Sequence, residues 1–189
     1  MGLPTGIQNS VIAFANVLVQ SNINSFGSDA MAACGTYSKL QGFAFLPITS
    51  FAMALTTFIS QNLGAREYDR AKRGARFGIL ATISMAEIIG IILAIFAPTL
   101  VRAFNSDPRV VSIAVQQARI ESLFFLLLAF SHAVAGICRG AGRATVPMMV
   151  MLMVWCVFRI IFISVAMARW HDIRILFWAY PLTWSISSA

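Results

Sequence analysis

The sequence has few charged side chains for its length. Only 11% of its 189 residues are Asp, Glu, Lys or Arg, whereas 59% are hydrophobic. Soluble domains carry roughly 25% charged and 45–50% apolar residues, because charge has to cover their surface. This chain cannot cover a water-exposed surface in that way, so we expect a membrane protein surrounded by the lipid bilayer.

Cysteine is also scarce, and the three residues form no C-x-x-C pair. Cys34, Cys138 and Cys156 lie in or beside apolar stretches, where we expect small buried side chains rather than disulfides or metal ligands. No His, Cys and Asp cluster has metal-ligand spacing, and no order of Ser, His and acid indicates a hydrolase. A G-x-x-x-x-G-K-[ST] loop is missing too. We therefore expect no enzyme, no cofactor and no bound metal.

Long runs with little or no charge fill most of the chain. The six predicted spans cover approximately residues 3–24, 34–63, 77–101, 110–138, 146–168 and 174–189. A helix needs about 20 apolar residues to cross a bilayer, and the runs are too long for barrel strands. Asp107 and Pro108 fit the N-cap and first position of the fourth span. The predicted fold is an all-α membrane protein with six transmembrane helices.

The 14 basic residues are distributed unevenly over the connections between these spans. Five of them fall within eleven consecutive positions: Arg66, Arg70, Lys72, Arg73 and Arg76. The even connections hold seven basic residues and the odd ones four. Basic residues mark the cytoplasmic side, so we expect a multi-pass protein of the inner or plasma membrane with both ends of the chain cytoplasmic. Apart from Tyr68 the basic stretch has no aromatic residue for base stacking, and we expect no nucleic-acid partner.

Five short motifs follow one another over nearly the whole chain. They are GLPTGIQNS at Gly2–Ser10, NSFGSDAMAACG at Asn24–Gly35, SQNLGAREYDRAKRGA at Ser60–Ala75, AGICRGAGRATVPM at Ala135–Met148 and AYPLTW at Ala179–Trp184. Each is weak alone, but their order resembles the C-terminal six-helix half of the MATE (multidrug and toxic compound extrusion) transporter family. The resemblance implies a twelve-helix secondary transporter built from two six-helix lobes. This chain would be one lobe, a fragment whose partner, the N-terminal six-helix lobe, is missing.

The resemblance also implies a function. Family members export small amphipathic, often cationic drugs or toxic compounds by alternating access, in exchange for H⁺ or Na⁺. Two alternatives remain, a structural membrane subunit and a lipid or lipid-linked sugar flippase of the wider superfamily, whose cavity should be lined by several cations. Three basic residues fall within the predicted spans, Lys39, Arg119 and Arg159, and so few favour the exporter.

Three ionisable side chains inside the predicted spans are candidates for ion coupling. Glu121 ranks first, and His132 lies close to the same face of the fourth span at 100° per residue. Glu87, near the middle of the third span, ranks second. The structural alternative is an ion pair between such an acid and one of the basic residues within the spans. Sodium-coupled members of the family carry an acid where Leu128 stands here, which weighs against Na⁺ coupling through this lobe. Other members couple protons through an acid in their first helix, which this chain lacks, so the choice between H⁺ and Na⁺ stays open.

Candidate substrate-cavity residues come from polar and aromatic stripes on the first two spans. Amides share one face of the first span, where interhelical packing is an equally good explanation. An aromatic and Met-rich face of the second span could bind flat drugs, although ordinary packing is the favoured alternative. The candidates are Asn9, Asn16, Gln20, Gln41, Phe43, Met53 and Gln117.

Overall fold

The computed structural model describes residue 13 and residues 15–189, and every secondary-structure element in those residues is helical. The all-α prediction is therefore confirmed for this part of the chain. Residues 15–24 are helical and precede the other elements. These are α2 (Ser28–Gly64), α3 (Tyr68–Arg102), α4 (Pro108–Ser122), α5 (Phe125–Gly140), α6 (Thr145–Met151), the π-helix η1 (Leu152–Phe158), α7 (Arg159–Arg169) and α8 (Ile173–Ser188).

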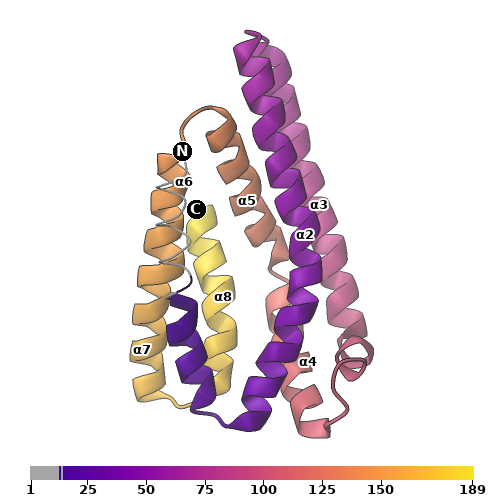
Figure 1. Cartoon of the computed structure of the whole chain (residues 1–189), viewed down its shortest axis with the longest axis vertical. Coiled ribbons are helices and arrows are strands. Elements are labelled where there is room, and N and C mark those ends of the chain that lie inside the picture. Colours follow the sequence, from indigo (N-terminus) through magenta and orange to yellow (C-terminus); the bar gives the residue numbers. More distant parts are fainter. Residues whose placement is uncertain (1–12, 14) are drawn as a thin grey trace.

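The helices form two groups joined by a central pair (Figure 1). α2 and α3 make a long antiparallel hairpin on one side, and α7, α8 and residues 15–24 lie together on the other. α4 and α5 contact both the hairpin and α8. The central pair therefore lies between the two groups and connects them.

The α2–α3 hairpin is longer than a membrane crossing. α2 has 37 residues and α3 has 35, which at 1.5 Å per residue gives about 55 and 52 Å against a hydrocarbon thickness of about 30 Å. The basic stretch predicted as a connection is mostly helix, because only residues 65–67 separate α2 from α3. Charged residues with good helix propensity continue α3 back to Tyr68, so the helix begins before the expected start of the third span at residue 77, which stays a prediction.

The fourth predicted span, residues 110–138, is not one continuous helix. α4 ends at Ser122, α5 begins at Phe125, and the two axes are bent by 53°. A side chain at Gly90 of α3 would clash with the Ser122 carbonyl oxygen, so the α3 backbone packs directly against the end of α4. The prediction of one continuous helix over residues 110–138 was therefore wrong. The helix is broken where it packs closely against α3, and no Pro or Gly in the local sequence indicates this break.

Other boundaries lie close to the predicted ones. Asp107 accepts a hydrogen bond from the Arg109 backbone N–H at 2.8 Å and Pro108 is the first residue of α4, which confirms the predicted cap. α6, η1 and α7 form one continuous segment where the fifth span was expected. The π-helical stretch within it was not foreseen, because sequence periodicity does not distinguish it from α-helix.

Three described segments are individually long and apolar enough to cross a membrane. They are α2, α3 and the run from Thr145 to Arg169, and α4 with α5 would add a fourth if the bent pair is one span. α8 has 16 residues, and the first predicted span lies largely outside the described residues. The count of six spans therefore stays a prediction.

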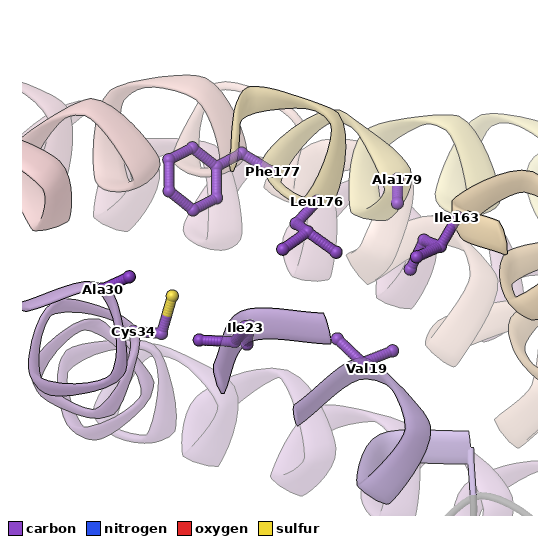
Figure 2. Packing of buried hydrophobic residues seen from close by; sticks show 8 residues of the cluster. All are labelled: Val19, Ile23, Ala30, Cys34, Ile163, Leu176, Phe177 and Ala179. Atoms are coloured by element: carbon purple, nitrogen blue, oxygen red, sulfur yellow. The ribbon is translucent and has the colours of Figure 1, made fainter. Parts of the chain in front are cut away.

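A buried apolar cluster fixes the N-terminal helix against the last two helices (Figure 2). Val19 and Ile23 face Ile163 of α7 and Leu176 and Phe177 of α8. Cys34 belongs to the same cluster, and all three cysteines are free. Their expected role as small buried side chains fits Cys34 and Cys156, whereas Cys138 is partly exposed.

Candidate functional site

A buried carboxyl group lies on the inner face of α4, near the break. Glu121 is 0% exposed. Gln117, one turn earlier on α4, donates from Nε2 to Oε1 of Glu121 at 2.8 Å, and Gln41 of α2 donates from Nε2 to Oε2 at 3.3 Å. The two amides therefore bind both oxygens of one carboxyl group and connect α4 to the hairpin.

Two further oxygens beside this carboxyl group lack a hydrogen bond of standard geometry to any described residue. One is the Gln117 carbonyl oxygen Oε1, and the other is the hydroxyl of Tyr37, which faces Glu121. Leaving a buried polar atom without a partner typically costs about 1–3 kcal/mol. We call Glu121, Gln117, Gln41 and Tyr37 the carboxylate cluster.

A buried guanidinium group acts on this cluster through space. Arg159 is 5% exposed and interacts electrostatically with Glu121, yet no ion pair within 4.0 Å joins Glu121 to any described residue. Its Cζ lies 4.5 Å from the centroid of the Tyr180 ring, and Nη2 donates to Oγ1 of Thr183 at 3.1 Å. Lys39 is exposed. The direct ion pair considered as a structural explanation for Glu121 is therefore not formed in this conformation.

The second acid candidate lies at the α4–α5 break instead. The carboxyl group of Glu87 on α3 interacts with the backbone N–H of Leu126, in the first turn of α5. The N-cap residue of α5, Phe124, makes no capping hydrogen bond with its own side chain. Glu87 thus lies beside the start of α5 without a hydrogen bond of standard geometry to a described residue, and its oxygen Oε2 is buried without a partner among those residues.

His132 lies within a ring cluster on α5. Its Nδ1 is 3.0 Å from the backbone oxygen of Leu128, and its ring centroid is 5.1 Å from that of Phe45 and 5.5 Å from that of Trp155. No hydrogen bond between His132 and Glu121 is present in the described structure. These contacts are those of a packed aromatic side chain, so the geometry gives His132 less support than Glu121 as the ion-binding group.

The candidate cavity residues are distributed over different surfaces. Asn9 lies outside the described residues. Four others are exposed: Asn16, Gln20, Phe43 and Met53. Gln41 and Gln117 contact Glu121 directly, which places them in the carboxylate cluster. The structure therefore brings together two of the expected cavity residues and the first-ranked acid.

No sequence pattern assigns a site role to three residues in and around the site, Tyr37, Tyr180 and Thr183. Tyr37 and Gln41 are four positions apart, which puts both on one face of α2 and could have linked them. Tyr180 and Thr183, which contact Arg159, lie three apart on α8. No group of three or more His, Cys, Asp or Glu residues in the described chain could hold a metal ion.

The sequence and the fold both resemble those of known proteins. The MatE family model matches residues 4–165. The chain belongs to the MatE family. One relative of this MatE chain, the Probable multidrug resistance protein YoeA of Bacillus subtilis, is 25% identical over 147 residues. Another, the Probable multidrug resistance protein NorM of Thermotoga maritima, is 28% identical over 155 residues.

The match covers only part of each relative. It includes 78% and 79% of this chain but 32% of YoeA and of NorM. The MatE chain thus spans about a third of the length of the curated relatives it matches.

The fold agrees with solved MATE structures. One is described as the outward-facing conformation of a multidrug resistance MATE family transporter of the MOP superfamily. It superposes with a TM-score of 0.91 at 19% identity, over 98% of this chain and 41% of that one. At this identity the likeness establishes the fold alone, and the MatE chain has the fold of one lobe of such a multi-pass membrane transporter.

Proposed function

We propose that this MatE chain is one lobe of an ion-coupled exporter of amphipathic, often cationic compounds, and that Glu121 binds the coupling ion. The relatives are named multidrug resistance proteins. The observation that carries the ion site is a carboxyl group with 0% exposure and no ion pair within 4.0 Å to a described residue. A second lobe, contributed by the rest of a longer protein, would complete the substrate pathway by alternating access in the cell membrane.

The carboxylate cluster can accommodate either H⁺ or Na⁺. Protonation would turn one oxygen of Glu121 into a donor, and the Gln117 carbonyl oxygen could accept that hydrogen bond after rotation of the amide group. Sodium would use oxygen ligands, which Glu121, Gln117 and Tyr37 provide. In both cases the bound ion neutralises the buried carboxylate, so the same four residues serve either coupling ion.

Neutralising Glu121 would change its interaction with Arg159. A charged Glu121 attracts the guanidinium group, whereas a neutral one leaves Arg159 held by Tyr180 and Thr183 of α8. Ion binding on α4 would therefore alter the force between α4 and the α7–α8 pair. An ion that acts differently on two arrangements of these helices can shift the balance between them, as exchange by alternating access requires.

The flippase alternative needs several cations along an internal surface. Among the described residues, Arg159 is the only basic side chain that is buried. Lys39 and Arg119 are both exposed. This distribution supports the exporter.

The test is Glu121→Gln in the full-length transporter that contains this lobe. The amide keeps the shape and hydrogen bonding of the side chain but cannot take up a coupling proton or supply its charge. We expect at least a tenfold loss of efflux driven by an imposed H⁺ or Na⁺ gradient in vesicles, with drug binding and thermal stability close to wild type. Glu87→Gln is the matched control and should retain efflux.

Two results would contradict this role for Glu121. Wild-type efflux by Glu121→Gln would exclude it as the ion-binding group. Low stability of Glu121→Gln that is restored by neutralising Arg159 would show instead that the two charges form a structural pair, whose disruption typically costs about 3–5 kcal/mol.

A further inference from the structure

A groove with a volume of about 820 Å³ lies on the surface of the lobe, away from the carboxylate cluster. The last turns of α3, the connection after it and the outer face of α4 form its walls. This end of the lobe is opposite the connection between α2 and α3 (Figure 1). Pro98 and Val115 supply apolar surface, and Ser112 and Gln116 supply polar groups.

Two arginines line this groove without a counter-charge. Arg102 and Arg119 are exposed, and the side chain of neither forms an ion pair or hydrogen bond with a described residue. No Asp or Glu is among the described lining residues. Side chains on a helix point toward its N-terminus, so Arg119 leans along α4 toward the end where Arg102 lies. The groove therefore presents two uncompensated positive charges to one ligand.

The surface next to the groove is suited to acyl chains. At 100° per residue, Arg102 lies within about 40° of Ile88, Ile91 and Ile95 on α3. These three isoleucines are 59%, 44% and 64% exposed. The wall of a water-filled cavity would carry polar side chains, whereas this stripe is apolar and ends at a positive charge. The apolar stripe matches the acyl chains of a lipid, and the positive charge at its end matches an anionic headgroup.

We propose that the groove binds the phosphate group of an anionic phospholipid, with Arg102 and Arg119 contacting the phosphate oxygens and the acyl chains lying along the isoleucine stripe. Arginine is well suited to this contact, because its planar donors bind phosphate through charge-assisted hydrogen bonds. This lipid stays bound at the exterior surface of the lobe and is not a transported substrate. It would fix the α3–α4 connection at the level of the headgroups.

The experiment uses the full-length transporter purified in detergent. Binding of phosphatidylglycerol and of phosphatidylcholine with the same acyl chains is measured by native mass spectrometry. A basic residue near an anionic membrane surface is worth about 1 kcal/mol, or roughly fivefold in affinity. We therefore expect the double variant Arg102→Gln/Arg119→Gln to bind phosphatidylglycerol roughly 30-fold more weakly, and wild type to prefer it over phosphatidylcholine.

The control is Arg70→Gln/Arg73→Gln, which removes the same charge from exposed positions at the start of α3. This variant should change phosphatidylglycerol affinity less than threefold. An equal loss in both double variants would mean diffuse attraction to the protein's net charge, and no loss at Arg102 and Arg119 would exclude the site.

A second measurement asks whether the groove is open in the whole protein. A fluorophore on Ser112→Cys should be quenched by brominated phosphatidylglycerol more strongly than by brominated phosphatidylcholine, and inorganic phosphate should not displace the lipid. Absence of quenching would show that another part of the protein covers the groove, and displacement by inorganic phosphate would identify a simple anion site. Either result would overturn the proposal.

Discussion

At the scale of single residues, Arg159 is notable because aromatic rings hold it where a carboxylate would be expected. The guanidinium carbon lies 4.5 Å from the Tyr180 ring centroid and 5.9 Å from that of Trp155. A desolvated cation over an aromatic ring gains about 2 kcal/mol. The planar group can stack on Tyr180 while still donating to Thr183, which an ammonium group does less well.

This geometry predicts that the conservative substitution is the more harmful one. Arg159→Lys keeps a buried charge but loses the stacked plane and the forked donors, and we expect it to lower the free energy of unfolding by about 2–4 kcal/mol. Arg159→Met removes the charge with similar side-chain length. Thr183 then retains its hydrogen bond to the Tyr180 backbone oxygen, so the loss should be smaller.

Thermal unfolding of the two full-length variants in one detergent tests this order. A lower Tm for Arg159→Met than for Arg159→Lys would show that the positive charge itself stabilises the lobe. In that event the interaction with Glu121 would contribute more to stability than the rings do.

At the scale of elements, the α4–α5 break depends on groups supplied by α3. A helix that begins inside a membrane has backbone N–H groups that lipid cannot satisfy. Glu87 is directed at one of them, on Leu126, and the absent side chain at Gly90 lets the α3 backbone reach Ser122. Two residues of α3, three positions apart, thus support the end of α4 and the start of α5.

Removing the Glu87 carboxyl group should destabilise the lobe without altering ion coupling. We expect Glu87→Ala to lower the free energy of unfolding by about 1–2 kcal/mol, the usual loss for a capping side chain, and Glu87→Gln to lower it less because an acceptor oxygen remains. Thermal unfolding gives the stabilities, and efflux in vesicles gives the coupling. If Glu87→Gln were stable but had lost gradient-driven efflux, Glu87 rather than Glu121 would be the ion-binding acid.

Two glycines of the AGICRGAGRATVPM motif, Gly140 and Gly142, have different structural roles at the end of α5. A side chain at Gly140 would clash with the Thr56 carbonyl oxygen of α2, so close helix packing needs glycine there. Gly142 has a φ of 77°, a left-handed conformation that ends the helix. The motif therefore contains one residue needed for a close helix contact and one needed for a turn. The sequence alone indicates only part of these two roles.

Helix content was predictable here, whereas the break in the fourth span was not. Long apolar runs and the Asp107–Pro108 start signal are local features, and the helices follow them closely. The segment from Gln117 to Phe130 has no Pro or Gly, and its break is associated with α3 residues about 30 positions earlier. Nothing in the local periodicity reports such a contact.

The site was predictable to a similar degree. Gln117 and Glu121 are four apart on one helix, so their contact follows from spacing. The contact between Gln41 and Glu121 joins residues 80 positions apart and required the packing of α2 against α4. The roles of Tyr37, Tyr180 and Thr183 were not predictable for the same reason, because they depend on which faces of three helices meet.

At the scale of the whole molecule, the orientation in the membrane can be tested at the start of α2 and at the start of α3, where α2 has already ended. Asp69 and Ser28 are exposed, whereas Ala71 is buried and unsuitable for labelling. The excess of basic residues in the even connections predicts that the region of Asp69 is cytoplasmic. We expect an impermeant thiol reagent to label Asp69→Cys only from the cytoplasm and Ser28→Cys only from outside.

The parent protein without added cysteines serves as the control for that experiment. It is needed because Cys138 is partly exposed. Labelling of both positions from one side would show that α2 does not cross the bilayer, and labelling from the reversed sides would invert the proposed orientation.

Because the α2–α3 hairpin is longer than a membrane crossing, a small tilt of the hairpin would move its far end over a large distance. Gln41 of α2 touches Glu121, and the far end of the helix at Gly64 is about 35 Å away at 1.5 Å per residue. If the hairpin pivots at Gln41 as a rigid rod, a tilt of about 10° sweeps its tip through about 6 Å. A displacement too small to resolve beside the carboxyl group would thus be amplified in the aqueous phase, where a distance probe can follow each turnover.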